Sequence, residues 1–283
     1  MNKILVGVTG KGENTAALKF AAQQAAALHE SVTLVHAIHP MLAPPPPSVL
    51  LVDNDWDYIG RAVLADVEEE FRSLTHDEVP VDVIGMGGKP ASVFAELSSE
   101  ARLVVLQHRD LSRLYRITSG STAASVATFA HCPVVSVPAT HDDHVHHGVV
   151  TAGVHEDGGP VSVLETAFDE ADRSGRALSV VHAYRLPAAY DDVLMHDARW
   201  RNETHAAITA KVDETAAKHP EVTVDVAIRH DWPADVLAEL SRTSDLLVVG
   251  RHGHCRMLPA RLGSMARSVL AHAECPVMVV PVG

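Results

Sequence analysis

Short apolar runs alternate with amphipathic stretches along the whole chain. The runs, for example Leu103–Leu106 and Leu246–Val249, consist of Val, Leu and Ile without intervening polar residues. Such continuous runs are typical of strands buried on both faces of a parallel sheet, and the stretches between them show helical spacing. The pattern predicts strands near 3–8, 31–37, 81–84, 102–106, 133–137, 149–154, 177–183, 222–228, 245–249 and 277–281, and, in the first half, helices near 14–29, 57–75, 90–100 and 121–131.

The pattern of the first half returns in the second half. Gly120–Ser121 corresponds to Gly263–Ser264 at an offset of 143 residues. The same offset relates Cys132–Pro133 to Cys275–Pro276. An offset held at several points indicates two copies of one structural unit. Strands that alternate with helices predict an α/β fold, here two tandem doubly wound five-stranded parallel-sheet domains whose ligand crevices lie at the carboxyl ends of the strands.

The predicted domains span 1–140 and 148–283, and residues 141–147 form a polar link between them. The link contains four histidines, His141, His144, His146 and His147. A cluster of this kind can hold a metal ion, but an exposed flexible linker is the favoured interpretation, because no fixed scaffold orients the side chains.

Composition narrows the functional classes. Hydrophobic content of 47% with 21% charged residues is typical of a globular protein. The net charge of −13 argues against general binding to nucleic acid or to an anionic membrane surface. The N-terminus enters a strand directly, no apolar segment reaches membrane-spanning length, and the chain has three cysteines. We therefore expect a cytoplasmic protein without a disulfide framework.

A glycine motif in the second half is the strongest functional signal. Gly250–Gly253 reads G-x-x-G directly after the apolar run, and nine residues later Gly263–Ser264 precedes a helical pattern. Glycines let the backbone approach an anion, and the N–H groups of a helix start point at it. The surrounding arginines are Arg251, Arg256, Arg261 and Arg267. The motif therefore indicates phosphate or nucleotide binding, although a plain turn glycine and an ordinary helix cap remain the alternative interpretation.

Taken over its full length, the chain resembles two tandem copies of the universal stress protein family. The resemblance is carried by the glycine motif, by Ala273–Val280, by the opening Ile4–Val8 and by the strand end Val181–Ala183. In that family this glycine motif accompanies ATP binding, so the resemblance implies an adenine-nucleotide site in the second half. The implied nucleotide-binding residues are Gly250, Arg251, His252, Gly253, Gly263, Ser264, Met265, Ala266, Val154, His155 and Ala183.

Within that implied site the glycines and Ser264 would hold the phosphates and ribose, and Met265 and Ala266 would continue the helix start. Ala183 would offer backbone to the adenine edge, and Val154 would form a wall beside the base. ATP-binding relatives usually carry an aspartate after the first strand, where this chain has His155. His155 is either a nucleoside contact without the geometry of a carboxylate or a solvated loop residue.

The first half departs further from the family pattern. Thr9 stands at the position of that aspartate, and Gln107 and Asp110 replace the two loop glycines. Side chains then fill the space through which backbone would approach phosphate, and Asp110 adds a repelling charge. We expect this half to bind ATP weakly or not at all.

The leading hypothesis is an ATP-binding stress-response regulatory protein, with or without Mg²⁺, that forms a homodimer and acts on other regulatory proteins. The second hypothesis is a slow ATPase, for which only Glu156 and Asp157 approach the crevice as carboxylates, so we expect no true enzyme. The third is a protein-interaction scaffold that binds no nucleotide. Binding without turnover separates the first hypothesis from the other two.

Overall fold

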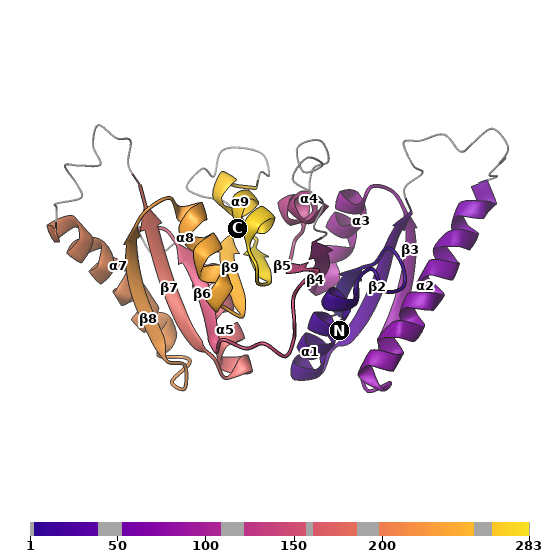
Figure 1. Ribbon diagram of the computed structural model, residues 1–283, viewed down its shortest axis with the longest axis horizontal. Coiled ribbons are helices and arrows are strands. Elements are labelled where there is room, and N and C mark those ends of the chain that lie inside the picture. The colour runs from indigo at the N-terminus through magenta and orange to yellow at the C-terminus, as the bar shows by residue number, and fades with distance from the viewer. Residues whose placement is uncertain are drawn as a thin grey trace. The chain divides into compact units, whose positions relative to one another are not determined.

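The chain folds into two compact units, Met1–Asp143 and His144–Gly283 (Figure 1). This computed structural model describes residues 3–38, 53–108, 122–156, 161–185, 198–251 and 262–282. The division between the units falls inside the predicted link.

The N-terminal unit alternates strands and helices, as expected from its sequence pattern. Its elements are β1 (Lys3–Gly7), α1 (Thr15–Leu28), β2 (Ser31–Ile38), α2 (Asp53–Thr75), β3 (Val81–Gly87), α3 (Pro90–Leu97), the 3₁₀ turn η1 (Ser98–Glu100), β4 (Ala101–His108), α4 (Thr122–Phe129) and β5 (Val134–Pro138).

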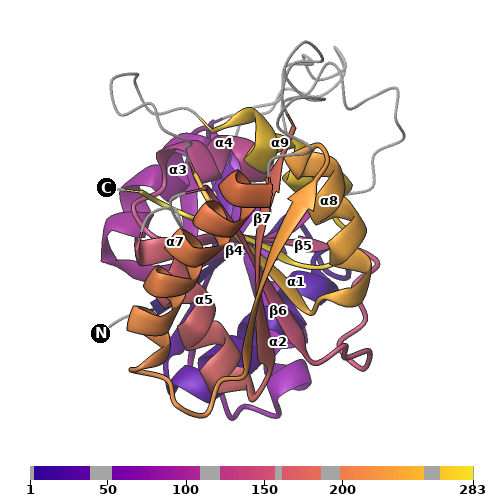
Figure 2. The same cartoon turned by 90° about the vertical axis from the view of Figure 1, so that its left-hand side faces the viewer.

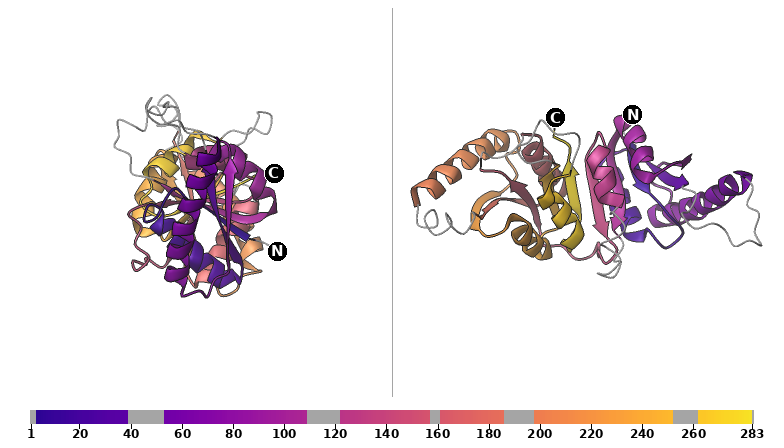
Figure 3. Two further views of the ribbon diagram at one scale, coloured as in Figure 1. Left: turned by 90° about the vertical axis from the view of Figure 1, so that its right-hand side faces the viewer. Right: turned by 90° about the horizontal axis from the view of Figure 1, so that it is seen from above.

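All neighbouring strands of this unit are parallel, in the order β3-β2-β1-β4-β5. Helices α1 and α2 pack together, α3 packs on α4, and the long helix α2 runs along β2 and β3 (Figure 3). The central strand β1 is the point from which the chain winds in both directions. Its carboxyl end, and those of β2 and β4, therefore form the crevice of this unit.

The C-terminal unit repeats the arrangement. Its elements are β6 (Val149–Val154), α5 (Val161–Ser174), β7 (Ala177–Tyr184), α7 (Ala198–Ala216), β8 (Val224–His230), α8 (Pro233–Leu240), the 3₁₀ turn η2 (Ser241–Thr243), β9 (Leu246–Gly250), α9 (Ser264–His272) and β10 (Val277–Val280). The strand order is β8-β7-β6-β9-β10, again parallel. Figure 2 shows α5 and α7 on one side of this sheet and α8 on the other.

The predicted fold class is confirmed by this topology. Because the chain is poor in aromatic residues, the cores consist mainly of Val, Leu, Ile and Ala, with Phe71, Phe94 and Phe168 as the largest fully buried side chains. The observed bounds differ from the predicted ones by a few residues in several elements. The strand predicted near 81–84 continues to Gly87, and the helix predicted near 90–100 ends at Leu97 and closes with a 3₁₀ turn.

Candidate functional site

A cavity of about 220 Å³ lies at the carboxyl ends of β6, β7 and β9 in the C-terminal unit. Strand ends, helix α8 and the start of helix α9 all contribute to it. The lining residues are Gly153, Val154, His155, Val163, Val181, His182, Ala183, Pro233, Leu237, Gly250, Arg251, Gly263, Ser264, Met265 and Ala266. The cavity therefore occupies the crevice that the topology predicts as the ligand position.

Glycines at two neighbouring strand ends keep this crevice open. Gly153 lies near the end of β6, and Gly250 ends the adjacent strand β9. A Cβ atom added to Gly153 would lie 2.9 Å from Cδ1 of the buried Leu237. A side chain at Gly153 would thus fill the space between the sheet and helix α8.

Helix α9 begins at the cavity, and its N-cap residue, Gly263, has no side chain. Among the residues that the structure describes, no side-chain hydrogen bond caps this helix start. The first turn contains Ser264, Met265 and Ala266, none of them acidic. The N–H groups of a helix start have no partner within the helix, and the helix dipole makes this end positive. The arrangement favours an anion at this end of the cavity.

Arg251 adds a positive charge at the same end. Its backbone N–H donates to the carbonyl oxygen of Val280 at 2.9 Å, and its carbonyl oxygen accepts from Gly263 N–H at 3.0 Å. The first bond joins the end of β9 to β10, and the second joins it to the start of α9. The residue is half-buried, and burial lowers the pKa of its guanidinium below the usual value. A cation that has lost part of its hydration interacts more strongly with an anionic ligand.

The opposite end of the cavity is formed by β6 and β7. His182 is 5% exposed, and its Nδ1 lies 3.0 Å from the carbonyl oxygen of Val154. His155 follows Val154 and is half-buried in the cavity wall, and Ala183 follows His182. Val163, Val181, Pro233 and Leu237 add apolar surface to the cavity lining.

Every predicted site residue in the described part of the chain lines this one cavity, whereas His252 and Gly253 lie outside the described residues. Sequence reasoning missed several lining residues. Gly153 could have been found from its position beside Val154. Pro233 and Leu237 could have been found only from the packing of α8, and His182 has a counterpart in the first half, His36, so the sequence does not mark it as a site residue.

The N-terminal unit has a different arrangement at the equivalent strand ends. Gln107, which takes the place of Gly250, reaches from β4 to the start of α1. Thr9 N–H donates to Oδ1 of the buried Asn14 at 2.8 Å, and its hydroxyl contacts the Glu13 carboxylate at 2.8 Å. The loop after β1 is thereby tied to α1 by the chain's own side chains. Gly120, Ser121 and Asp110 lie outside the described residues.

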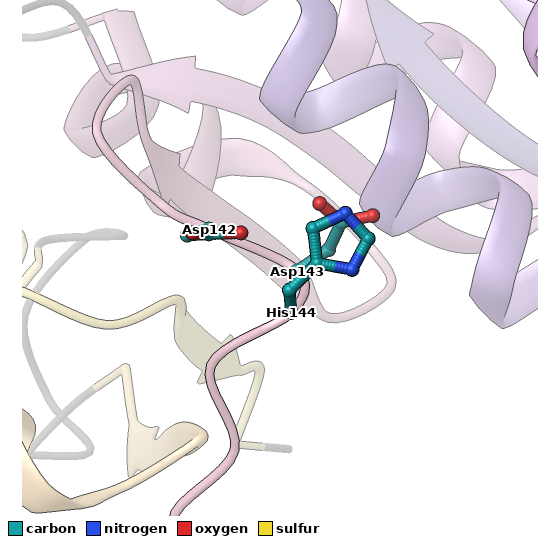
Figure 4. Close-up of side chains that lie close together, drawn as sticks. All are labelled: Asp142, Asp143 and His144. Atoms are coloured by element: carbon teal, nitrogen blue, oxygen red, sulfur yellow. The ribbon is translucent and has the colours of Figure 1, made fainter.

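Carboxylates are absent from the described lining of the cavity. Glu156 is exposed and does not line it, and Asp157 lies outside the described residues. Among the described residues, one acidic and histidine group offers ligand atoms within 4.8 Å of one another: Asp142, Asp143 and His144 of the link (Figure 4). Asp143 already pairs with Lys19 of α1 at 2.9 Å.

No helix in the described part of the chain combines the length and apolar character needed to cross a membrane.

Comparisons with known sequences match the chain to one protein family over both of its repeated units. The sequence model of the universal stress protein family matches residues 1–138 and again residues 150–281. A universal stress protein of Mycolicibacterium smegmatis is 32% identical over 296 residues, covering 98% of this chain and 96% of the relative. One from Mycobacterium tuberculosis strain H37Rv is 30% identical over 288 residues with the same coverage.

Solved structures show the same fold. The crystal structure of a universal stress protein from Archaeoglobus fulgidus aligns with a TM-score of 0.73 and 17% identity, covering 100% of this chain and 97% of that one. The fold, the repeated unit and the sequence matches lead to one conclusion: the chain belongs to the universal stress protein family, as a tandem member with two copies of the family's unit.

Proposed function

We propose that the C-terminal unit binds ATP or a related adenine nucleotide in the 220 Å³ cavity, and that the protein is a regulatory module and not an enzyme. The observation that carries this proposal is the shared cavity wall. The end of β9, the start of α9 and the ends of β6 and β7 lie far apart in sequence, yet all contribute to one cavity.

The α9 end is suited to the phosphates. The helix start, Ser264 with its hydroxyl group, and the half-buried Arg251 with its guanidinium group all belong to the cavity lining, and no side chain among the described residues caps the helix. Backbone donors at a helix start combined with an arginine are a recurrent phosphate-binding arrangement. Mg²⁺, if it accompanies ATP, would be held by the phosphate oxygens and water, because the described lining supplies no carboxylate.

The β6–β7 end is suited to the base. Val154, Val163, Val181 and Leu237 provide apolar surface for a purine ring, and the backbone at Ala183 lies at the end of the β7 ladder. Sites for small ligands are typically apolar with a few placed polar groups. A nucleotide bound with its phosphates at α9 would thus extend its base toward β7.

Catalysis is not part of the proposal. Fast phosphoryl transfer needs metal ligands and a group that orients the attacking water. The described cavity wall contains no acid, and the exposed Glu156 lies outside it. We therefore propose that occupancy of the site, and not turnover, is the signal, acting through a homodimer or through contact with other regulatory proteins.

Calorimetric titration of the whole protein with ATP and Mg²⁺ tests the proposal, with parallel measurement of phosphate release. We expect one site per chain with a micromolar dissociation constant and no turnover. Gly263→Asp should abolish binding, because it places a carboxylate against the phosphates at the helix start.

Gly120→Asp is the matched control, because it makes the same change at the repeat-related position of the first half. This variant should bind like the wild type. A folded, nucleotide-free protein that takes up no ATP would refute the proposal, and turnover lost on changing Glu156 would favour the ATPase hypothesis instead.

A further inference from the structure

His155 directly follows strand β6, is half-buried and belongs to the cavity lining. Alternate residues of a strand share a face, and two of them mark the side of β6 that α8 covers. The Thr151 hydroxyl lies 2.7 Å from Oγ of Ser244, in the segment that follows α8. A Cβ atom on Gly153 would lie 2.9 Å from Leu237 of α8, which itself lines the cavity. His155 continues this row, on the same side of the sheet.

The order of the strands places His155 near the middle of the proposed ligand. Strand β6 pairs with β9 on one side and with β7 on the other. In the proposed function, on which the following step rests, the phosphates lie at the start of α9, which Gly263 joins to the end of β9, and the base lies toward β7. The sugar and the phosphate attached to it then pass over the end of β6, where His155 lines the cavity.

Two further charged or titratable side chains line the described part of the cavity with His155. These are Arg251, at the end of β9, and His182 of β7, which is 5% exposed and engages the carbonyl oxygen of Val154 through Nδ1. Among the described residues, α5, α8 and α9 contribute no charged side chain to the lining. Glu156, next along the chain, is exposed and lies outside it. The described cavity wall therefore carries positive charge and no negative charge.

We propose that His155 couples nucleotide binding to the uptake of a proton, so that the site holds its anionic ligand more tightly as the pH falls. Imidazole is the side chain that gains a proton near neutral pH. In the empty cavity, Arg251 and the positive end of helix α9 oppose a further positive charge. The phosphates of a bound nucleotide reverse this balance and favour the imidazolium form. By reciprocity, protonation of His155 strengthens binding by the same factor.

Calorimetric titration of the whole protein with ATP and Mg²⁺ tests the coupling directly. The titration is run at about pH 7.5 in two buffers of different ionisation enthalpy, because the difference in heat gives the number of protons taken up on binding. ATP in complex with Mg²⁺ is already deprotonated at this pH, so any uptake belongs to the protein. We expect the wild type to take up a fraction of a proton, and its dissociation constant for ATP to fall about fivefold from pH 8 to pH 6.

Two variants at this position separate charge from shape. His155→Gln keeps a polar side chain that does not titrate, so it should take up no proton and should bind ATP with nearly the same affinity at both pH values. His155→Lys carries a fixed positive charge, so it should also take up no proton but should keep tight binding at pH 8. His205→Gln is the control, because His205 is an exposed histidine of α7 outside the cavity lining. It should behave like the wild type.

Each contrary outcome has a distinct meaning. Proton uptake that persists in His155→Gln would assign the proton to another group and overturn the inference. Loss of ATP binding in a folded His155→Lys protein would show that the site rejects a positive charge there, and would also overturn it. A wild type that binds ATP without proton uptake would overturn the inference alone, and that measurement needs no variant. Failure to bind ATP at either pH would overturn the proposed function and this inference together.

Discussion

Gln107 Nε2 donates a hydrogen bond of 2.7 Å to the carbonyl oxygen of Glu13, joining the end of β4 to the loop before α1. The other amide atom of Gln107, Oε1, accepts from the backbone N–H of Ala17 at 3.2 Å. One side chain thus uses both its donor and its acceptor across the crevice of the N-terminal unit. The equivalent position in the C-terminal unit is Gly250, which has no side chain to do so.

The first prediction concerns this exchange of residues. Gly250→Gln should weaken ATP binding at least tenfold, because a glutamine side chain at the end of β9 enters the cavity that Gly250 lines. Titration calorimetry measures the change. The reciprocal variant, Gln107→Gly, removes the bridge but leaves Asp110 in the loop, and should create no second site. Unaltered affinity in Gly250→Gln would contradict the proposed position of the ligand.

A second prediction concerns Asp245, which fixes the beginning of the C-terminal unit. Its buried carboxylate accepts from the backbone N–H groups of His147 and Gly148 at 2.8 and 2.7 Å and pairs with Arg176 Nε at 3.0 Å. Asp245→Ala should lower the free energy of unfolding of this unit by about 3 to 5 kcal/mol, because it leaves these groups without their partner. Urea denaturation followed by circular dichroism measures this loss.

Arg102 is the repeat-related control for Asp245. Its guanidinium lies 3.5 Å from Glu30 and is 45% exposed. This contact is long and its cation is partly exposed, whereas the Glu30 side chain is only 12% exposed, so Arg102→Ala should destabilise the protein less than Asp245→Ala does. Equal losses in the two variants would show that the network at Asp245 contributes no more than this single long ion pair.

A third prediction concerns the contact between β6 and α8. Gly153→Ala adds a Cβ atom 2.9 Å from Leu237 Cδ1, in a buried region, and should lower the free energy of unfolding by about 1 to 3 kcal/mol. Gly87→Ala is the control, because a Cβ atom there meets nothing within 4 Å. A chemical denaturation series on both variants tests the difference. A stabilised Gly153→Ala protein would mean that Leu237 moves aside without cost.

The fourth prediction concerns Cys132 and Cys275. Burial raises the pKa of each thiol to about 12. The thiol form is thereby favoured in the folded protein, so neither residue should react with iodoacetamide at pH 8 until the protein is unfolded. Mass spectrometry of a Cys255→Ser variant measures the labelling. Rapid labelling of either cysteine in the folded protein would contradict the burial.

The same shift has a consequence for stability. Unfolded cysteines ionise near pH 8.5, whereas the folded thiols stay protonated up to about pH 12. The two thiols therefore contribute no pH-dependent loss below pH 8.5, and stability decreases as the pH rises from there toward 12. Replacing both cysteines by alanine should flatten this part of the stability curve.

The fold was predictable because its signals are local and repeated. Apolar runs such as Leu246–Val249 are readily assigned as strands when they alternate with helical stretches. Each strand or helix predicted in the first half can also be compared with the corresponding segment of the second half. The position of the glycine motif was predictable for a related reason, since Gly250 and Gly263 have no side chain and their residue type alone shows that backbone is accessible there. Their positions at a strand end and a helix start follow directly from the sequence pattern.

Contacts between distant side chains were not predictable in the same way. The sequence shows that Gln107 replaces a glycine, but not that its amide reaches Glu13 and Ala17. Likewise His36 and His182 occupy matching positions, yet only His182 is almost fully buried. That difference depends on the elements packed around each ring, and no local pattern encodes it.

The bridge made by Gln107 also shapes how the chain would respond to rising ligand concentration. With one crevice crossed by its own side chain and one open, each chain should fill along a simple hyperbola, half complete when free ligand equals the dissociation constant. A steeper, sigmoidal dose-response would then have to arise between chains and not within one. The N-terminal unit would bind no nucleotide at any concentration, so only the C-terminal unit would change its occupancy.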